Sequence, residues 1–201
     1  MKELKTILNE NSFVEKLNED LKNGGVIAFV TDTVWGLGCL PNCPKAVDKI
    51  YDIKGRDRSK PLILMSDSSE NLFPYIEKIS NLGMSLINQY FPGALTIVTK
   101  KSEKTPLYIT SNKSTVGIRV PDNLFFKKLC SVIDGGVLAT TSANLSNHPS
   151  SKTYEEAKNS IGNYVNYVFE DYGCICKGLE STVILLEDSN IKILRQGAII
   201  L

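Results

Sequence analysis

The sequence predicts an α/β protein with a mixed parallel and antiparallel sheet and helices packed on it. Short apolar runs that suit buried strands alternate with segments of helical periodicity over most of the 201 residues. Roughly the last 35 residues contain mainly strand-like runs, which indicates antiparallel additions to the sheet. We expect residues 1–201 to form a single domain, because a chain of this length can bury a core of its own.

Each of the first three expected helices has a local signal. The first begins at a capping box formed by Ser12 and Glu15 and ends before Gly24. The second follows Pro44, a residue that suits the first helical turn. The third covers residues 80–90, where apolar residues recur at helical spacing.

Two further helices are expected in the second half of the chain. Asp122 is the expected cap of the fourth helix, which closes at Gly135. Thr153 opens the fifth, with Glu156 three residues later. The expected strands are short apolar runs, and they cover residues 26–31, 61–65, 95–99, 116–120, 137–141, 165–169, 182–186 and 191–194.

Composition and charge exclude several classes of protein. The chain has 23 Lys and Arg against 22 Asp and Glu, a net charge of +1, which excludes nucleic-acid binding driven by bulk charge. A composition of 42% hydrophobic and 22% charged residues is that of a globular protein rather than a disordered one. No apolar run approaches the ~18 residues of a membrane span, and residues 1–15 do not resemble a secretory signal. We therefore expect a cytoplasmic protein with no membrane association.

Cysteine and histidine usage gives no support to a metal site. Five cysteines in a chain without a secretory signal are expected to be reduced thiols. Cys39 with Cys43, and Cys174 with Cys176, lack the second half of a zinc motif, and His148 is the only histidine. We expect no metal motif in the protein itself, and a Ser-His-Asp triad built on this one loop histidine has little support.

The common nucleotide-binding and hydrolase motifs are also absent from the sequence. Gly36 and Gly38 have Pro41 where a dinucleotide fingerprint needs its third glycine, and no P-loop, HExxH or GxSxG pattern occurs. Polar segments nevertheless follow several expected strands, at the sheet edge where α/β proteins bind ligands. The candidate site must therefore be sought in these segments.

Three cations stand close together before the second expected strand. Lys54, Arg56 and Lys60 lie within seven residues in a predicted loop, and such a group repels itself unless an anion such as phosphate lies between its members. A solvated basic turn, neutralised by Asp52 and Asp57, explains the same spacing equally well.

Hydroxyl and amide groups give a second, equally open signal. Ser142 and Asn144 point the same way on an extended segment and could bind a phosphate or ribose, although capping a turn is the commoner role. Thr33 is similarly ambiguous, and Trp35 is more often a packing residue than a stacking platform. Arg56, Arg58, Arg119 and Arg195 are the only four arginines, and all but Arg58 are candidates for binding phosphate or carboxylate.

Taken together, these segments resemble the YrdC/TsaC family, the threonylcarbamoyl-AMP synthases. The resemblance runs from Gly25 to Gly197 and rests on seven short motifs that occur in order. They are TDTVWGLG (31–38), the KxR motif at Lys54 and Arg56, SKPLILM (59–65), STVGIRVP (114–121), the SxN motif within TSANLSNHPS (141–150), ESTVI (180–184) and LRQG (194–197). The resemblance implies a twisted mixed sheet around a deep, positively lined cavity, in a short form of the family that lacks an extra C-terminal domain.

The resemblance also implies a reaction, in which L-threonine, bicarbonate and ATP, with Mg²⁺ on the ATP, give threonylcarbamoyl-AMP and pyrophosphate. The product feeds the threonylcarbamoyladenosine modification beside the anticodon of tRNA, through downstream transfer proteins. By matched position, the implied ATP contacts are Arg56, Lys60, Thr115, Ser142, Asn144, Ser150 and Arg195. The implied threonine contacts are Thr33, Met65, Arg119, Thr140 and Ser181, with Met65 standing where some members place a polar residue.

Lys54 and Arg56 are the expected catalytic pair. Because both stand in a predicted loop, replacing either by alanine is expected to abolish adenylation and leave the fold intact. Two departures from the family pattern are Trp35 in place of a usual tyrosine and Asp57 in place of a common proline.

Two alternatives remain open at this point. The first is an RNA-binding module that uses the cavity for RNA, with a weak tRNA or double-stranded RNA patch at Lys100, Lys101, Lys104, Lys127 and Lys128. The second is a carbamoyl-adenylate domain like that of hydrogenase-maturation proteins, which belong to much longer chains.

Overall fold

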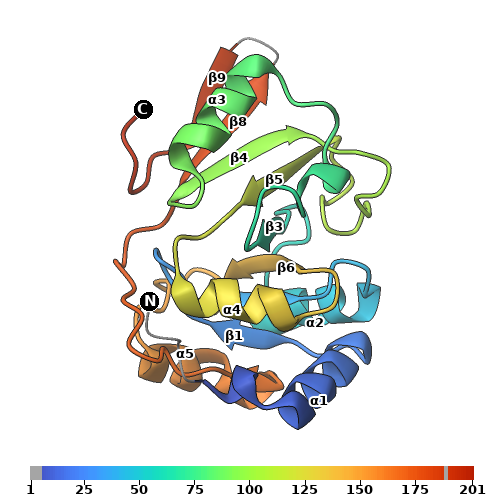
Figure 1. Ribbon diagram of the computed structural model, residues 1–201, viewed down its shortest axis with the longest axis vertical. Helices are drawn as coiled ribbons and strands as arrows, with labels where there is room; N and C mark the ends of the chain where they lie inside the picture. The colour runs from blue at the N-terminus through green and yellow to red at the C-terminus, as the bar shows by residue number, and fades with distance from the viewer. Residues whose placement is uncertain (1–5, 188–189) are drawn as a thin grey trace.

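One nine-stranded sheet organises the protein in the computed structural model, which describes residues 6–187 and 190–201 (Figure 1). The strands follow the spatial order β7-β1-β2-β6-β3-β5-β4-β8-β9. Their bounds are β1 Ile27–Phe29, β2 Gly36–Cys39, β3 Ile63–Ser66, β4 Leu95–Lys100, β5 Thr115–Arg119, β6 Val137–Ser142, β7 Tyr167–Val168, β8 Thr182–Glu187 and β9 Asn190–Arg195.

The sheet is mixed, which confirms the expected fold class. Three pairs are parallel, namely β1 with β7, β3 with β5 and β4 with β8, while the other neighbours are antiparallel. The expectation that the late strands are antiparallel additions holds only for β9. It is wrong for β7 and β8, because each reaches back to a strand far earlier in the chain and joins it in parallel.

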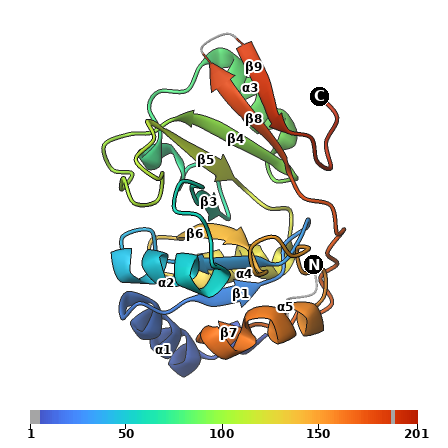
Figure 2. The ribbon, with the colours of Figure 1, turned by 180° about the vertical axis from the view of Figure 1, so that it is seen from behind.

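Five α-helices and three short 3-10 helices lie in the described part of the chain. Their bounds are α1 Asn11–Lys22, α2 Pro44–Lys54, α3 Asn81–Tyr90, α4 Leu124–Val132 and α5 Tyr154–Ile161, with η1 Ile7–Asn9, η2 Phe73–Tyr75 and η3 Gly162–Tyr164. In Figure 1, α4 lies in front of β6 and β1, whereas in the reverse view of Figure 2 α2 lies in front of the sheet. Helices therefore cover both faces of this part of the sheet.

Two of the expected helix caps are wrong. Ser12 lies inside α1, whose N-cap is Glu10 without a side-chain cap bond. The cap of α4 is Asn123 rather than Asp122, and its Oδ1 accepts a hydrogen bond from the Phe126 amide at 3.0 Å. In both cases the boundary is displaced by one or two residues. The cap at Thr153 is confirmed, since its hydroxyl accepts from the amide three residues later at 3.2 Å.

The sequence pattern did not reveal β2, which lies in the polar segment after β1. Gly36 and Gly38 stand on this strand because the Phe29 ring packs over them, and a Cβ at Gly36 would lie 2.5 Å from that ring. The same ring meets Phe126 of α4 with centroids 5.1 Å apart. The two glycines thus leave room for the Phe29 ring to pack against this strand. They also weaken the strand pattern in the sequence, because glycine has a low strand propensity.

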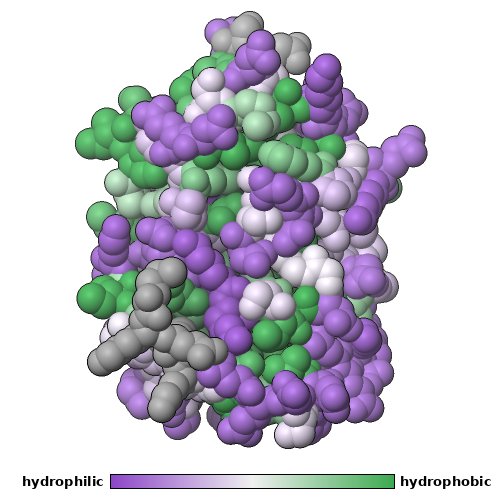
Figure 3. All heavy atoms as spheres, in the orientation of Figure 1, coloured by the Kyte–Doolittle hydropathy of each residue, from purple (hydrophilic) through white to green (hydrophobic). Residues whose placement is uncertain are grey.

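None of the described helices is long and apolar enough to cross a membrane. On the face shown in Figure 3, hydrophilic side chains dominate and hydrophobic ones form small separate groups.

Candidate functional site

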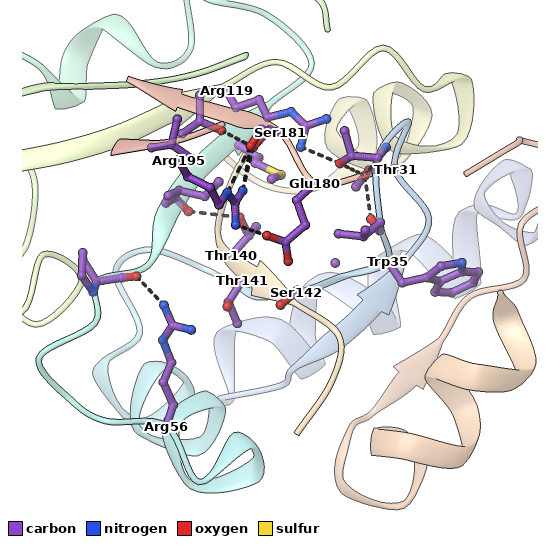
Figure 4. Close-up of a pocket in the computed structure, with 18 residues that line it drawn as sticks. Thr31, Trp35, Arg56, Arg119, Thr140, Thr141, Ser142, Glu180, Ser181 and Arg195 are labelled. Atoms are coloured by element: carbon purple, nitrogen blue, oxygen red, sulfur yellow. Dashed lines mark hydrogen bonds and ion pairs between the residues drawn. The ribbon is translucent and has the colours of Figure 1, made fainter. Parts of the chain in front are cut away.

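A cavity of about 260 Å³ opens on one face of the sheet (Figure 4). Seven strands that are neighbours in the sheet contribute to its wall, together with the segments before β2, β3 and β8. The lining residues are Thr31, Thr33, Val34, Trp35, Gly36, Arg56, Pro61, Ile63, Met65, Thr96, Arg119, Thr140, Thr141, Ser142, Glu180, Ser181, Val183 and Arg195.

Strand register explains why distant residues meet at this cavity. Ser142 lies opposite Gly36, Thr140 lies opposite Ile63, and Met65 lies opposite Arg119. Because alternate residues of paired strands share a face, these side chains line one surface. On the next strands Thr96 lies opposite Val183 and continues the same surface.

Arg119, at the end of β5, is almost fully buried in the cavity wall. Its Nε donates to the Gly93 carbonyl at 2.9 Å, Nη1 donates to Thr33 Oγ1 at 2.8 Å, and Nη2 pairs with Asp32 Oδ1 at 2.5 Å. Burial lowers the pKa of this guanidinium, while the Asp32 carboxylate opposes that shift. Three of its five N–H groups are therefore used by the protein, and one on each terminal nitrogen remains for a ligand.

The Thr33 hydroxyl has a fixed role in this network. Thr31 Oγ1 donates its only proton to the Val34 carbonyl at 2.7 Å, so in the 3.1 Å contact between the two threonine hydroxyls Thr33 is the donor. Thr33 also accepts from Arg119. Its hydroxyl can then only accept a further hydrogen bond, which suits an ammonium or another donor.

Arg195 on β9 lies against Ser181 and Glu180, and its charge also lowers the pKa of Arg119. Its Nε and Nη2 donate to the Ser181 carbonyl at 3.2 and 2.9 Å, and Nη2 also contacts Ser181 Oγ at 3.2 Å. Nη1 forms an ion pair with Glu180 Oε2, whose other oxygen accepts from Ser150 Oγ at 2.7 Å. Ser181 Oγ lies 2.8 Å from Thr96 Oγ1, so a chain of polar contacts crosses three strands.

Arg56 reaches the cavity from the segment after α2. Its Nε donates to the Lys60 carbonyl at 3.2 Å and Nη2 to the Pro61 carbonyl at 3.1 Å. Partial burial lowers the pKa of Arg56, against the opposing effects of Tyr51 and Asp57. The remaining N–H groups of this fork are free to bind an anion.

Among the described residues, the acidic neighbours form no ion pair at contact distance with Arg56 or Lys60, although the charge of Asp57 interacts with both at longer range. Asp57 Oδ1 instead accepts from the Ser59 amide at 2.8 Å, and Asp52 pairs with Arg58. Arg56 and Lys60 enter no described ion pair. This favours the anion-binding interpretation of the segment over a solvated basic turn.

Lys54 does not lie in a loop, so the expectation that its loss leaves the fold intact rests on a wrong placement. It is the last residue of α2, and 3% of its surface is exposed. Its ammonium donates to the carbonyls of Ser142 and Asn144, each at 2.5 Å, and to Asn144 Oδ1 at 3.2 Å. Within the KxR motif, Lys54 therefore holds the backbone of the SxN motif, whereas Arg56 lines the cavity. Gly55, in the left-handed conformation (φ 55°), ends the helix and was the signal for this placement.

The cavity brings together most of the expected threonine contacts and only some of the expected ATP contacts. Thr33, Met65, Arg119, Thr140 and Ser181 line it, as do Arg56, Ser142 and Arg195. The rest lie elsewhere: Lys60 is exposed, Asn144 is buried beneath Lys54, and Ser150 touches the cavity through Glu180. Thr115 stands at the opposite end of β5 from Arg119 and lines a separate hollow beside α3.

Two carboxylates of the site carried no role in the sequence analysis. Asp32 balances Arg119, and Glu180 connects Ser150 with Arg195. Each belongs to a quoted motif, so a carboxylate beside expected cationic contacts was the available signal. The interpretation of Trp35 as a packing residue is supported, because its buried ring leans on Tyr154 with centroids 6.0 Å apart.

Gly197 fixes the segment that follows Arg195. A Cβ at this position would lie 2.3 Å from the Glu180 carbonyl oxygen and 2.5 Å from the Ser181 carbonyl carbon. Gly197→Ala is therefore expected to lower the free energy of unfolding by about 1–3 kcal/mol, since backbone cannot yield as a side chain would. Urea denaturation measures this loss. The matched control is Gly162→Ala, whose new Cβ meets only side chains, with Lys158 at 3.4 Å and Val168 at 3.6 Å. An equal loss in both variants contradicts the prediction.

Residues 19–197 match the Sua5–YciO–YrdC family, whose description reads "Telomere recombination". The chain is 35% identical over 190 residues to a putative threonylcarbamoyl-AMP synthase of Methanocaldococcus jannaschii, covering 92% of this chain and 86% of that protein. It is 33% identical over 180 residues to the threonylcarbamoyl-AMP synthase of Photobacterium profundum, with 88% and 95% covered.

Solved structures agree with this relationship. The crystal structure of P. abyssi Sua5 complexed with L-threonine matches with a TM-score of 0.85 at 31% identity, over 94% of this chain. The chain spans only 55% of that Sua5 chain. E. coli YciO matches with a TM-score of 0.81 at 26% identity, over 92% of this chain and 89% of that one. Full-length HypF shares the fold, with a TM-score of 0.77 at 21% identity. From its motifs, its fold and these relatives, the chain belongs to the Sua5–YciO–YrdC family.

Proposed function

We propose that the protein is an L-threonylcarbamoyladenylate synthase. The observation that carries the proposal is the convergence of Arg56, Arg119 and Arg195 on one small cavity rich in hydroxyl groups. The threonine amine attacks the carbon of bicarbonate, water leaves, and an oxygen of the resulting carbamate attacks the α-phosphorus of ATP. Pyrophosphate departs and threonylcarbamoyl-AMP remains.

Arg119 and Thr33 form the proposed threonine end of the cavity. The two free N–H groups of Arg119 suit the two oxygens of a carboxylate, and Thr33 can accept a hydrogen bond from the amino acid. Ser181, Met65 and Thr140 complete this end. The relative whose structure contains L-threonine supports the assignment.

Arg56, Ser142 and Arg195 form the proposed ATP end. Four proposed ATP contacts have side chains outside the cavity wall, namely Lys60, Thr115, Asn144 and Ser150. We place Lys54 as a positioning residue, because all three acceptors within its reach belong to the SxN segment.

This chemistry places few demands on the protein beyond position and charge. The carbamate is itself the nucleophile, so no covalent intermediate with the chain is needed. Guanidinium and hydroxyl groups that hold two substrates in line and neutralise the triphosphate are sufficient.

Mg²⁺ is proposed to arrive with ATP as part of the substrate. Among the described residues, no group of three or more His, Cys, Asp or Glu is arranged to hold a metal ion. Glu180 is the one carboxylate in the described cavity wall. One carboxylate plus substrate phosphates is a usual donor set for Mg²⁺, so the residues fit a cation that the triphosphate brings. Its chemistry would be to neutralise charge on the phosphates.

The product is proposed to pass to transfer proteins that modify tRNA in the cytoplasm. Direct RNA binding stays a prediction without a supporting contact. Of the lysines expected to form the patch, Lys127 pairs with Asp122 and Lys104 lies over the Tyr75 ring. We therefore propose no second function.

Pyrophosphate release tests the proposed function. Purified protein is incubated with ATP and Mg²⁺, with L-threonine and bicarbonate each present or omitted. Release that requires both, with L-serine a much poorer substrate, is the expected result. Release independent of threonine, or none with all substrates present, contradicts the proposal.

A further inference from the structure

Glu180 occupies a distinctive place in the cavity. One carboxylate oxygen accepts from Ser150 Oγ at 2.7 Å, and the other pairs with Arg195 Nη1. Figure 4 shows this carboxylate beside the Arg195 guanidinium, within the ring of labelled cavity residues. Ser150 and Arg195 are both proposed nucleotide contacts, so one internal anion holds two groups that a phosphate would need.

The ion pair with Glu180 leaves Arg195 one N–H group without a protein partner, the second one on Nη1. Its Nε and Nη2 are directed to Ser181, and Nη1 is directed to Glu180. The bonds to Ser181 fix the plane of the guanidinium. A phosphate oxygen that binds Arg195 therefore binds the same Nη1 atom and lies next to the Glu180 carboxylate.

The charge of Glu180 acts on an incoming polyphosphate in two opposite ways. Before binding, it neutralises Arg195 and keeps this cation oriented. After binding, an ionised carboxylate beside phosphate oxygens repels them, because like charges at contact distance interact strongly in a partly desolvated site. The Glu180 side chain is 36% exposed, so water screens this repulsion only in part.

We propose that Glu180 is an internal stand-in for phosphate that makes polyphosphate binding depend on a divalent cation. The inference rests on the proposed function, since it assigns a selective role within the same site. A free polyphosphate that binds Arg195 must tolerate the charge of Glu180 beside it. A polyphosphate that carries a divalent cation turns the same carboxylate from a repulsive neighbour into an attractive one.

Calorimetric titration distinguishes this role from a merely orienting one. Tripolyphosphate and ATP are each titrated in EDTA and in Mg²⁺. For each probe, the readout is the Mg²⁺ ratio, which is the dissociation constant in EDTA divided by the dissociation constant in Mg²⁺. Glu180→Gln removes the charge but keeps an acceptor for Ser150, and Glu180→Ala removes both. Asp134→Asn is the control, because Asp134 pairs with exposed Lys22 away from the cavity and loses the same unit of charge.

In the wild type and in the control, Mg²⁺ is expected to tighten binding of both probes. In both Glu180 variants, binding in EDTA is expected to become about tenfold tighter, so the Mg²⁺ ratio falls by the same factor. An unchanged ratio in the Glu180 variants overturns the proposal. Weaker binding in EDTA and Mg²⁺ alike also overturns it, since Glu180 would then only orient Arg195.

The two probes separate this proposal from the proposed function. If tripolyphosphate shows the expected pattern and ATP does not bind, the role of Glu180 stands and the synthase assignment falls. If threonine-dependent pyrophosphate release is present and the Mg²⁺ ratio does not respond to Glu180, the synthase stands and this inference falls. If neither tripolyphosphate nor ATP binds, both proposals are contradicted.

Discussion

Arg119→Met is expected to lose threonine-dependent pyrophosphate release and to be destabilised by about 3–5 kcal/mol. The stability loss arises because Asp32 is left as a buried, unpaired carboxylate beside Thr33. The activity loss arises because the proposed carboxylate-binding N–H groups are gone. Urea denaturation and the pyrophosphate assay measure the two effects separately.

Two further variants divide stability from binding at this site. Arg119→Met with Asp32→Leu removes both charges, so most of the stability should return while the activity stays lost. Arg119→Lys keeps a charge for Asp32 but lacks the planar fork, so its main defect should be a raised KM for threonine. Full activity in the double variant would exclude Arg119 from threonine binding.

Lys54→Met is expected to destabilise the protein by about 1–3 kcal/mol and to abolish adenylation. Methionine fills a similar volume but leaves the carbonyls of Ser142 and Asn144 without their buried donor. The segment that carries Ser142 then loses its fixed position, although Lys54 itself does not line the cavity. Arg56→Ala is the matched comparison, because it should lose activity with little change in the free energy of unfolding. Equal stability of the Lys54 variant and the wild type would contradict the positioning role.

The pH dependence of the free energy of unfolding, compared between the wild type and Lys54→Met, is an additional check. Burial, followed by the charge of Arg56, lowers the pKa of Lys54 to about 7, from 10.5 in an exposed lysine. Between these values the unfolded chain binds a proton that the folded protein has lost, so raising the pH favours folding. The stability of the wild type relative to Lys54→Met should therefore be level below pH 7 and rise from about pH 7 towards pH 10. A difference that is constant over this range contradicts the lowered pKa.

The sequence predicted most elements because their signals are local. Every expected helix exists, and every expected strand overlaps an observed one. The failures have physical causes. Strand β2 was missed because Gly36 and Gly38 serve the Phe29 ring rather than a strand pattern. The parallel pairing of β7 and β8 is set by strands more than 80 residues earlier, and no local pattern encodes it.

The candidate site, too, was predicted from the sequence only in part. The motif resemblance predicted that Thr33, Arg119 and Arg195 contact substrates, and all three line one cavity. It could not separate groups that face a ligand from groups that hold them. Lys54 and Asp32 belong to the second kind, and only the packed structure shows which carbonyl or guanidinium each one holds.

The strand order has a consequence for the synthesis of the protein. During synthesis on the ribosome, Thr33 and Arg56 emerge long before Glu180, Ser181 and Arg195. One edge of β4 stays unpaired until β8 has been made, because β8 is its parallel partner. Once β6 has emerged, the six strands β1 to β6 can pair with one another while the cavity still lacks one wall. Because such distant pairings form slowly, a newly made molecule should acquire substrate-binding capacity only after β8 and β9 have joined the sheet.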